Sequence, residues 1–235
     1  MLKFADLFAG IGGFHFSLKS LGMKCVFTSE IDEVARKTYL KNFDEKYLSN
    51  PNLFAGDIWK VDFKKMPDFD ILCAGFPCQP FSQAGHKKGF KDNKDGNLFF
   101  AIEEIIRIKK PKVFFLENVR HLKNHDDGKT FKIIHKSLQK LNYSFDYKVI
   151  KASDFGLPQH RPRIYMVGFY KPLLKKKYKN YKFKFPNPIP LKKTMSQILG
   201  GFVSTDISGK VERKIGFTLR VGGKSSPIND RRNWD

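Results

Sequence analysis

The chain has 235 residues, 41% of them hydrophobic, which is enough to bury a core of ordinary size and excludes a chain disordered throughout. Its 44 lysine and arginine residues, against 23 aspartate and glutamate residues, give a net charge of +21, so a nucleic acid is the first partner to expect. The three cysteines form no disulfide framework, and no apolar run resembles a signal peptide or reaches the ~20 residues of a membrane helix, so we expect a cytoplasmic, non-membrane protein.

Short apolar runs alternate with amphipathic patterns over the first 170 residues. The apolar runs predict strands at 2–8, 24–29, 69–74, 113–116, 144–152 and 163–169. The amphipathic patterns predict helices at 12–21, 33–42, 98–108 and 130–141. This alternation is typical of an α/β fold whose largely parallel sheet carries helices on both faces.

Beyond residue 170 the pattern changes to Lys, Tyr, Phe and Pro, so we predict one domain at 1–170 and a second region at 171–235. No acidic residue lies between Asp154 and Asp206, whereas eleven lysine and arginine residues do. This segment is expected to carry much of the positive field. A generally lysine-rich surface is the alternative explanation.

The first predicted strand runs into a glycine-rich loop, Phe8-Ala-Gly-Ile-Gly-Gly13, and the second ends at Glu30. Glycines let a backbone approach a ligand, and a carboxylate at this distance suits ribose hydroxyls. Asp57 follows the next short apolar run and suits an adenine amino group. The pattern fits a nicotinamide dinucleotide, an adenosyl cofactor, or only a tight turn between strand and helix.

Cys78 lies in a loop directly after an apolar strand, between two prolines, and is the strongest candidate nucleophile in the chain. Glu117 follows the strand at 113–116 and would hold or donate a proton beside that thiolate, unless it only caps a helix or pairs with a cation. Arg161 and Arg163 precede and enter the last strand two residues apart, and this spacing predicts that both guanidinium groups share one face.

Together these residues resemble the DNA cytosine-5 methyltransferases, most closely the compact bacterial enzymes of restriction-modification systems. The resemblance covers about the first three-quarters of the chain. It rests on these runs: Asp6-Leu-Phe-Ala-Gly-Ile-Gly-Gly13, Glu30, Gly56-Asp57-Ile58, Gly75-Phe-Pro-Cys-Gln-Pro-Phe-Ser82, Gly96-Asn-Leu-Phe99, Glu117-Asn-Val119 and Gln159-His-Arg-Pro-Arg163.

The resemblance implies a Rossmann-like sheet that binds S-adenosyl-L-methionine, followed by the start of a small target-recognition domain. It implies that Cys78 adds to C6 of a cytosine rotated out of double-stranded DNA, with Glu117 at N3 and the exocyclic amine and with Arg161 and Arg163 fixing the substrate. The residues expected to bind the cofactor are Phe8, Ala9, Gly10, Gly12, Gly13, Glu30, Ile31, Asp57, Ile58, Pro77 and Leu98. The residues expected to contact DNA are Gln79, Ser82, Lys87, Lys88, Thr218 and Arg220. The corresponding location is the bacterial cytoplasm, where the protein would work at the nucleoid.

No metal site is predicted. His121 and His125 precede two aspartates, but Gly128 and the surrounding charges favour a solvated helix end, and the cysteines lack the partners of a zinc site.

The chain departs from the family at its C-terminal end. Thr218-Leu-Arg-Val-Gly-Gly223 resembles part of a recognition region, but the family's closing elements do not follow before Asp235. We therefore expect a fragment, a remnant, or one subunit of a split enzyme that a second polypeptide reactivates. A tRNA cytosine-5 methyltransferase, a DNA-binding protein without catalysis and a nicotinamide-dependent dehydrogenase are the competing functions, although the last leaves Cys78 and the arginine pair unexplained.

Overall fold

The fold is described from a computed structural model, which covers residues 1–43, 46–77, 98–174, 182–200, 204–206, 209–211 and 214–217. Its helices and strands in chain order are β1 (Lys3–Leu7), α1 (Gly13–Ser20), β2 (Lys24–Ser29), α2 (Glu33–Asn42), β3 (Phe54–Ala55), β4 (Ile71–Gly75), α3 (Leu98–Lys109), β5 (Val113–Val119), α4 (Lys129–Lys140), β6 (Asp146–Lys151), β7 (Gln159–His160), β8 (Pro162–Phe169), α5 (Met195–Ile198), β9 (Ser204–Asp206), β10 (Gly209–Val211) and β11 (Gly216–Phe217). Short 3₁₀ turns include η2 (Ile58–Lys60) and η4 (Arg120–Lys123).

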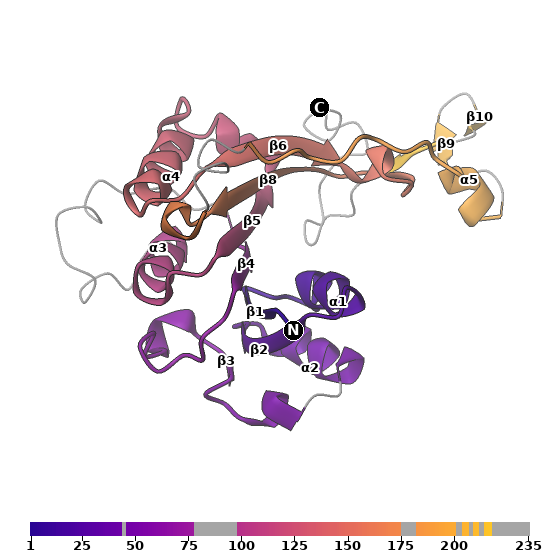
Figure 1. The fold of residues 1–235 in the computed structure, drawn as a ribbon. Coiled ribbons are helices and arrows are strands. Elements are labelled where there is room, and N and C mark those ends of the chain that lie inside the picture. Colours follow the sequence, from indigo (N-terminus) through magenta and orange to yellow (C-terminus); the bar gives the residue numbers. More distant parts are fainter. Residues whose placement is uncertain are drawn as a thin grey trace. The chain divides into compact units, whose positions relative to one another are not determined.

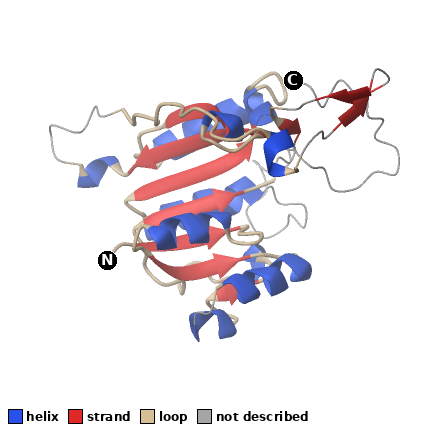
Figure 2. Cartoon of the chain, turned by 90° about the vertical axis from the view of Figure 1, so that its right-hand side faces the viewer, coloured by secondary structure: helices blue, strands red, loops and turns tan. Residues whose placement is uncertain are grey.

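The main sheet of the described residues has the strand order β3-β2-β1-β4-β5-β8-β6. The pairs β2–β3, β1–β2, β1–β4 and β4–β5 are parallel. Figure 2 shows these strands side by side. Because the chain leaves β1 toward β2 on one side and later enters β4 on the other, the strand order reverses next to β1, which is where open α/β sheets bind their ligands.

Alternate residues of the central strands enter different hydrophobic clusters. Ala5 and Leu7 of β1 belong to the main core with apolar residues of α3 and α4, whereas Phe4 packs with Leu18 of α1. Figure 1 shows α3 and α4 on one side of the strands and α1 and α2 on the other. Helices therefore cover both faces, which confirms the predicted α/β class.

The predicted elements agree with the structure within a few residues, and β2 and α2 agree at both ends. The largest difference in the site region is β5, which continues to Val119 instead of ending at residue 116. The polar residues Glu117 and Asn118 stay in the strand because backbone pairing with β4 continues as far as the pair Gly75 and Glu117.

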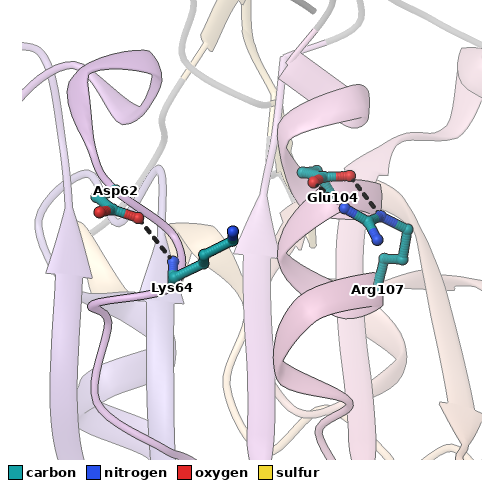
Figure 3. A network of polar contacts seen from close by, with 4 residues as sticks. All are labelled: Asp62, Lys64, Glu104 and Arg107. Carbon is teal, nitrogen blue, oxygen red and sulfur yellow. Dashed lines mark hydrogen bonds and ion pairs between the residues drawn. The ribbon is translucent and has the colours of Figure 1, made fainter.

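Local polar contacts shape the turns and helix surfaces around this sheet (Figure 3). Oδ1 of Asp62 accepts a hydrogen bond of 3.0 Å from the backbone N–H of Lys64, which closes a turn, and Nε of Arg107 donates one of 2.8 Å to Glu104 on α3. Contacts three residues apart on an exposed helix surface stabilise it by only about 0.2–0.5 kcal/mol, so burial of the apolar faces holds the fold.

The chain divides into two compact units, Met1–Lys148 with Ile164–Lys184, and Val149–Arg163 with Phe185–Asp235. In the second unit β11 pairs in parallel with β7, and α5 begins with a capping box in which Thr194 and Gln197 satisfy each other's backbone groups. Phe155 and Ile189 form a parallel bridge in the same unit.

Candidate active site

A tight loop joins β1 to α1, and Glu30 holds it. Phe8, Gly10 and Gly12 all have positive φ, at 55°, 56° and 96°. One carboxylate oxygen of Glu30 accepts a hydrogen bond of 2.7 Å from the Gly10 backbone N–H, and the other accepts one of 2.9 Å from the N–H of Asp32. The half-buried Glu30 therefore ties the loop to the start of α2, at the end of β2.

Gly12 fixes the position from which α1 begins. A Cβ atom at Gly12 would lie 2.2 Å from the Phe43 ring and 3.0 Å from that of Tyr39. At Gly10 and Gly13 an added Cβ would meet no atom within 4 Å among the described contacts. At Gly12 the loop thus packs against Tyr39 of α2 and against Phe43, which directly follows this helix, and it is open at Gly10 and Gly13.

Buried polar side chains connect the helices behind this loop. Nδ1 of His15 on α1 is hydrogen-bonded to the Tyr39 hydroxyl on α2, and that hydroxyl lies 3.1 Å from Oγ1 of Thr28 on β2. The His15 ring also stacks on Phe43, with 3.9 Å between ring centroids. These contacts hold α1, α2 and β2 in one arrangement and so position the loop between them.

Asp57 and Ile58 follow β3 at the same edge of the sheet. Oδ1 of Asp57 caps the η2 turn by accepting a 3.0 Å hydrogen bond from the N–H of Trp59. Ile58 is 3% exposed and belongs to the main core, whereas Ile31, beside Glu30, is 71% exposed. Ile31 therefore presents an apolar side chain at the surface, whereas Ile58 does not.

The ends of β4 and β5 bring Glu117 next to the segment that leads to Cys78. Gly75 is the register partner of Glu117, and a Cβ at Gly75 would lie 3.4 Å from a carboxylate oxygen of Glu117. The buried Asn118 donates a 2.8 Å hydrogen bond from its amide to the Phe76 carbonyl. Its own amide oxygen accepts from the N–H of Val119. Asn118 therefore fixes the backbone two residues before Cys78.

Cys78 lies outside the described residues, as do Gln79, Ser82, Lys87, Lys88, Thr218 and Arg220. Pro77, directly before Cys78, is exposed, and Leu98 begins α3 and is half-buried. The thiol of Cys73 is fully buried within β4, and burial, with Asp6 and Cys25 nearby, raises its pKa. A thiol held neutral in the core is not a nucleophile, so Cys73 is a structural cysteine.

Arg161 and Arg163 belong to the second unit. Arg161 lies between β7 and β8 and is exposed, whereas Arg163 is half-buried within β8 and donates a 2.8 Å hydrogen bond to the Pro162 carbonyl. The two-residue repeat of a strand was the reason to expect both side chains on one face. Arg161 directly precedes the first residue of β8, and the shared face of the two guanidinium groups stays a prediction.

Sequence reasoning assigned no role to two buried polar residues at this edge. Asn118 was part of a recognised motif, but its contact with Phe76 depends on the pairing of β4 with β5. Asp6, in the middle of β1, is fully buried, and neither of its carboxylate oxygens has a hydrogen-bond partner of good geometry within the described residues. A polar residue inside an apolar strand pattern was the available signal for it.

The described residues contain no cluster of three or more His, Cys, Asp or Glu that could hold a metal ion. In the same part of the chain, every helix is too short or too polar to cross a membrane.

Comparison with known proteins identifies the family. A family model described as C-5 cytosine-specific DNA methylase matches residues 2–220. Type II methyltransferase M.HhaI of Haemophilus parahaemolyticus is 46% identical over 198 residues, which are 84% of this chain and 57% of that protein. Type II methyltransferase M1.ScrFI of Lactococcus lactis subsp. cremoris is 50% identical over 86% of this chain and 49% of its own length. M.Bsp6I of Bacillus sp. (strain RFL6) is 40% identical over all of this chain and 70% of its own.

Solved structures share the fold at lower identity. A DNMT2 variant from Spodoptera frugiperda superposes with a TM-score of 0.65 at 21% identity, over 88% of this chain and 61% of its own. A putative DNA modification methyltransferase from an Escherichia coli prophage gives 0.59 at 24% identity, over 81% and 53%. These likenesses confirm the Rossmann-like methyltransferase fold.

The chain spans about half the length of the first curated relatives that it matches. The relatives named here do not support the expected second polypeptide. Since the family model covers most of the chain, and the strand order, the glycine loop and Glu117 agree with the expected plan, the chain belongs to the C-5 cytosine-specific DNA methylase family.

Proposed function

We propose that this protein transfers a methyl group from S-adenosyl-L-methionine to C5 of cytosine in double-stranded DNA, through covalent addition of Cys78 to C6 of a base rotated out of the helix. One observation carries the proposal. Glu117 and the segment leading to Cys78 meet at the ends of the adjacent strands β4 and β5, and the loop held by Glu30 leaves the next strand, β1. An acid, a nucleophile and a cofactor loop at one sheet edge suit a two-substrate transfer.

The residues around the β1–α1 loop fit the expected cofactor. Open space beside Gly10 and Gly13 leaves the loop backbone accessible, and the carboxylates of Glu30 and Asp57 follow β2 and β3, the two strands on one side of β1. The exposed Ile31 offers an apolar surface. We infer that Glu30 holds the ribose and Asp57 the adenine edge, and that the bound cofactor supplies an electrophilic methyl group.

Chemistry begins when the Cys78 thiolate forms a bond to C6, which breaks the C5–C6 double bond and leaves an enamine that is electron-rich at C5. Glu117 places a proton on N3, which neutralises the charge driven into the ring. C5 then takes the methyl group as the sulfonium becomes a thioether. Loss of the C5 proton to a base restores the C5–C6 double bond and expels Cys78 as a thiolate, and the proton on N3 returns to Glu117.

The net charge of +21 supports a polyanionic substrate, and the names of the Type II relatives support DNA in a restriction-modification system. Arg161 and Arg163 are proposed to fix the flipped cytosine and its backbone, because guanidinium groups suit carbonyl and phosphate oxygens. Contacts from Gln79, Ser82, Lys87, Lys88, Thr218 and Arg220 to DNA remain predictions.

Covalent trapping tests this proposal. Duplex DNA containing 5-fluorocytosine blocks loss of the C5 substituent, so the native protein with cofactor should form an adduct stable to denaturing electrophoresis. Cys78→Ser should form none. Cys73→Ala is the matched control, because that thiol is buried in β4 and should not be needed.

Two results would contradict the proposal. An adduct that forms in Cys78→Ser would show that another nucleophile acts. An adduct with 5-fluorocytosine tRNA and none with duplex DNA would transfer the chemistry to RNA. Glu117→Gln should still bind DNA but lose about 10²-fold or more of the methylation rate, the usual range for a positioned acid.

A further inference from the structure

Asp6 is a fully buried carboxyl group in the middle of β1 that the proposed reaction does not use. Its strand neighbours in register are Thr28 on β2 and Cys73 on β4. Neither carboxyl oxygen has a hydrogen-bond partner of good geometry within the described residues. A buried carboxylate left in this state is costly, so its presence calls for a physical reason.

Groups on β4, in the first turn of α1 and directly after β2 act on Asp6. Cys73 on β4 interacts with it electrostatically, and Cys25 on β2 interacts in turn with Cys73. The backbone amide of His15, in the first turn of α1, favours the charged form. Glu30, after β2, disfavours it because like charges repel.

These surroundings hold Asp6 as a neutral acid. Burial raises the pKa of Asp6 to about 8, the His15 amide opposes the shift, and the Glu30 carboxylate adds to it. Glu30 in turn binds the backbone N–H of Gly10 directly. Asp6 is therefore coupled through charge to the residue that holds the cofactor loop, without being part of the loop's surface.

We propose that Asp6 distinguishes the cofactor from its product by charge, releasing its proton to solvent when a cationic ligand occupies the β1–α1 loop and retaining it when a neutral one does. The inference rests on the proposed function. S-adenosyl-L-methionine carries a sulfonium charge that S-adenosyl-L-homocysteine lacks. An ionised Asp6 attracts the first ligand, whereas a neutral Asp6 is indifferent to the second, so this charge coupling adds to the affinity for the cofactor and not to that for the product.

The coupling is large enough to measure. A positive charge about 12 Å away, at an effective dielectric constant of about 20, makes a carboxyl group about ten times more acidic. Starting from a pKa of about 8, this change releases about half a proton at a pH midway through the transition. Because Glu30 already acts on Asp6 and also contacts the loop, a cation held by that loop should act on the Asp6 carboxyl group to a comparable extent.

Calorimetric titration in buffers of different ionisation enthalpy counts the protons released on binding. The native protein should release about half a proton more with S-adenosyl-L-methionine than with S-adenosyl-L-homocysteine. The amino groups of both ligands also titrate, so the decisive comparison is between the native protein and Asp6→Asn. In Asp6→Asn the difference in released protons between the two ligands should be smaller by about half a proton. Asp70→Asn is the matched control, since Lys112 already keeps the Asp70 carboxylate ionised, and it should leave the difference unchanged.

Infrared difference spectroscopy provides a second measurement if Asp6→Asn does not fold. In the Glu117→Gln background, the C=O band of a protonated carboxyl group should weaken with the cationic ligand and persist with the neutral one. A proton difference that survives in Asp6→Asn, or a band that responds equally to both ligands, would overturn the inference. Failure of the native protein to bind either ligand would instead refute the proposed cofactor, and the inference would fall with it.

Discussion

Gly12 is the position where one added methyl group should reveal how the cofactor loop is supported. Its φ of 96° lies in the left-handed region, and a Cβ atom there would come within 2.2 Å and 2.8 Å of two atoms of the Phe43 ring. The Tyr39 ring lies 3.0 Å away and is fixed by its hydrogen bonds to His15 and Thr28. The Tyr39 ring therefore cannot move aside without breaking these hydrogen bonds, and the Phe43 ring cannot move without leaving its stack on His15.

Two costs add in Gly12→Ala. The left-handed conformation costs a non-glycine residue about 1–2 kcal/mol, and forcing a methyl group into a packed site costs about 1–3 kcal/mol. The free energy of unfolding should therefore fall by about 2–5 kcal/mol, out of the ~5–15 kcal/mol typical of a domain. Because the methyl group also displaces the start of α1, affinity for S-adenosyl-L-methionine should fall as well.

Urea unfolding followed by circular dichroism measures the change, with Gly10→Ala and Gly13→Ala as matched controls. Gly10 has positive φ but open space for a Cβ, so its variant should lose only the conformational cost of about 1–2 kcal/mol. Gly13 has open space and begins α1, so its variant should keep the native stability. If Gly12→Ala is no less stable than Gly10→Ala, the packing argument is wrong.

Three further changes test other parts of the structure. Asn118→Ala should lower the methylation rate more than it lowers cofactor affinity, because it frees the backbone before the nucleophile. Equal losses would refute this. The variant should also lower the free energy of unfolding by about 1–3 kcal/mol. Gly168→Ala would place a Cβ 2.2 Å from the Phe114 ring and should lower the free energy of unfolding by about 1–3 kcal/mol. Urea unfolding should then show a lower midpoint. An unchanged midpoint would contradict the packing of β8 against β5. The hydrogen bond from Lys112 lowers the pKa of Asp70, so Asp70→Asn should lower the free energy of unfolding by at most about 1 kcal/mol at neutral pH. The free energies of unfolding of native protein and variant should converge as pH falls through the folded-state pKa of Asp70. A difference between them that widens in acid would show the reverse sign.

Much of the fold was predictable because its signals are local. The apolar runs and amphipathic patterns that predicted β2 and α2 depend on neighbouring residues alone, and both elements have the predicted ends. The glycine loop was also recognisable because glycine adopts positive φ readily, as Gly10 and Gly12 do, and Glu30 was recognisable because it directly follows an apolar run. The end of β5 was not predictable, because Glu117 and Asn118 are polar and stay in the strand only through pairing with β4.

By itself the sequence determined the α/β class, the order of the elements, the family resemblance and the candidate groups, since each of these follows from residue type and spacing. Only the tertiary structure decided that Asn118 holds the Phe76 carbonyl and that Gly12 lies against Phe43. It alone decided that Asp6 is a buried acid beside Cys73. Contacts, burial and the resulting charge state join residues far apart in the chain, and no local pattern encodes the distance between them.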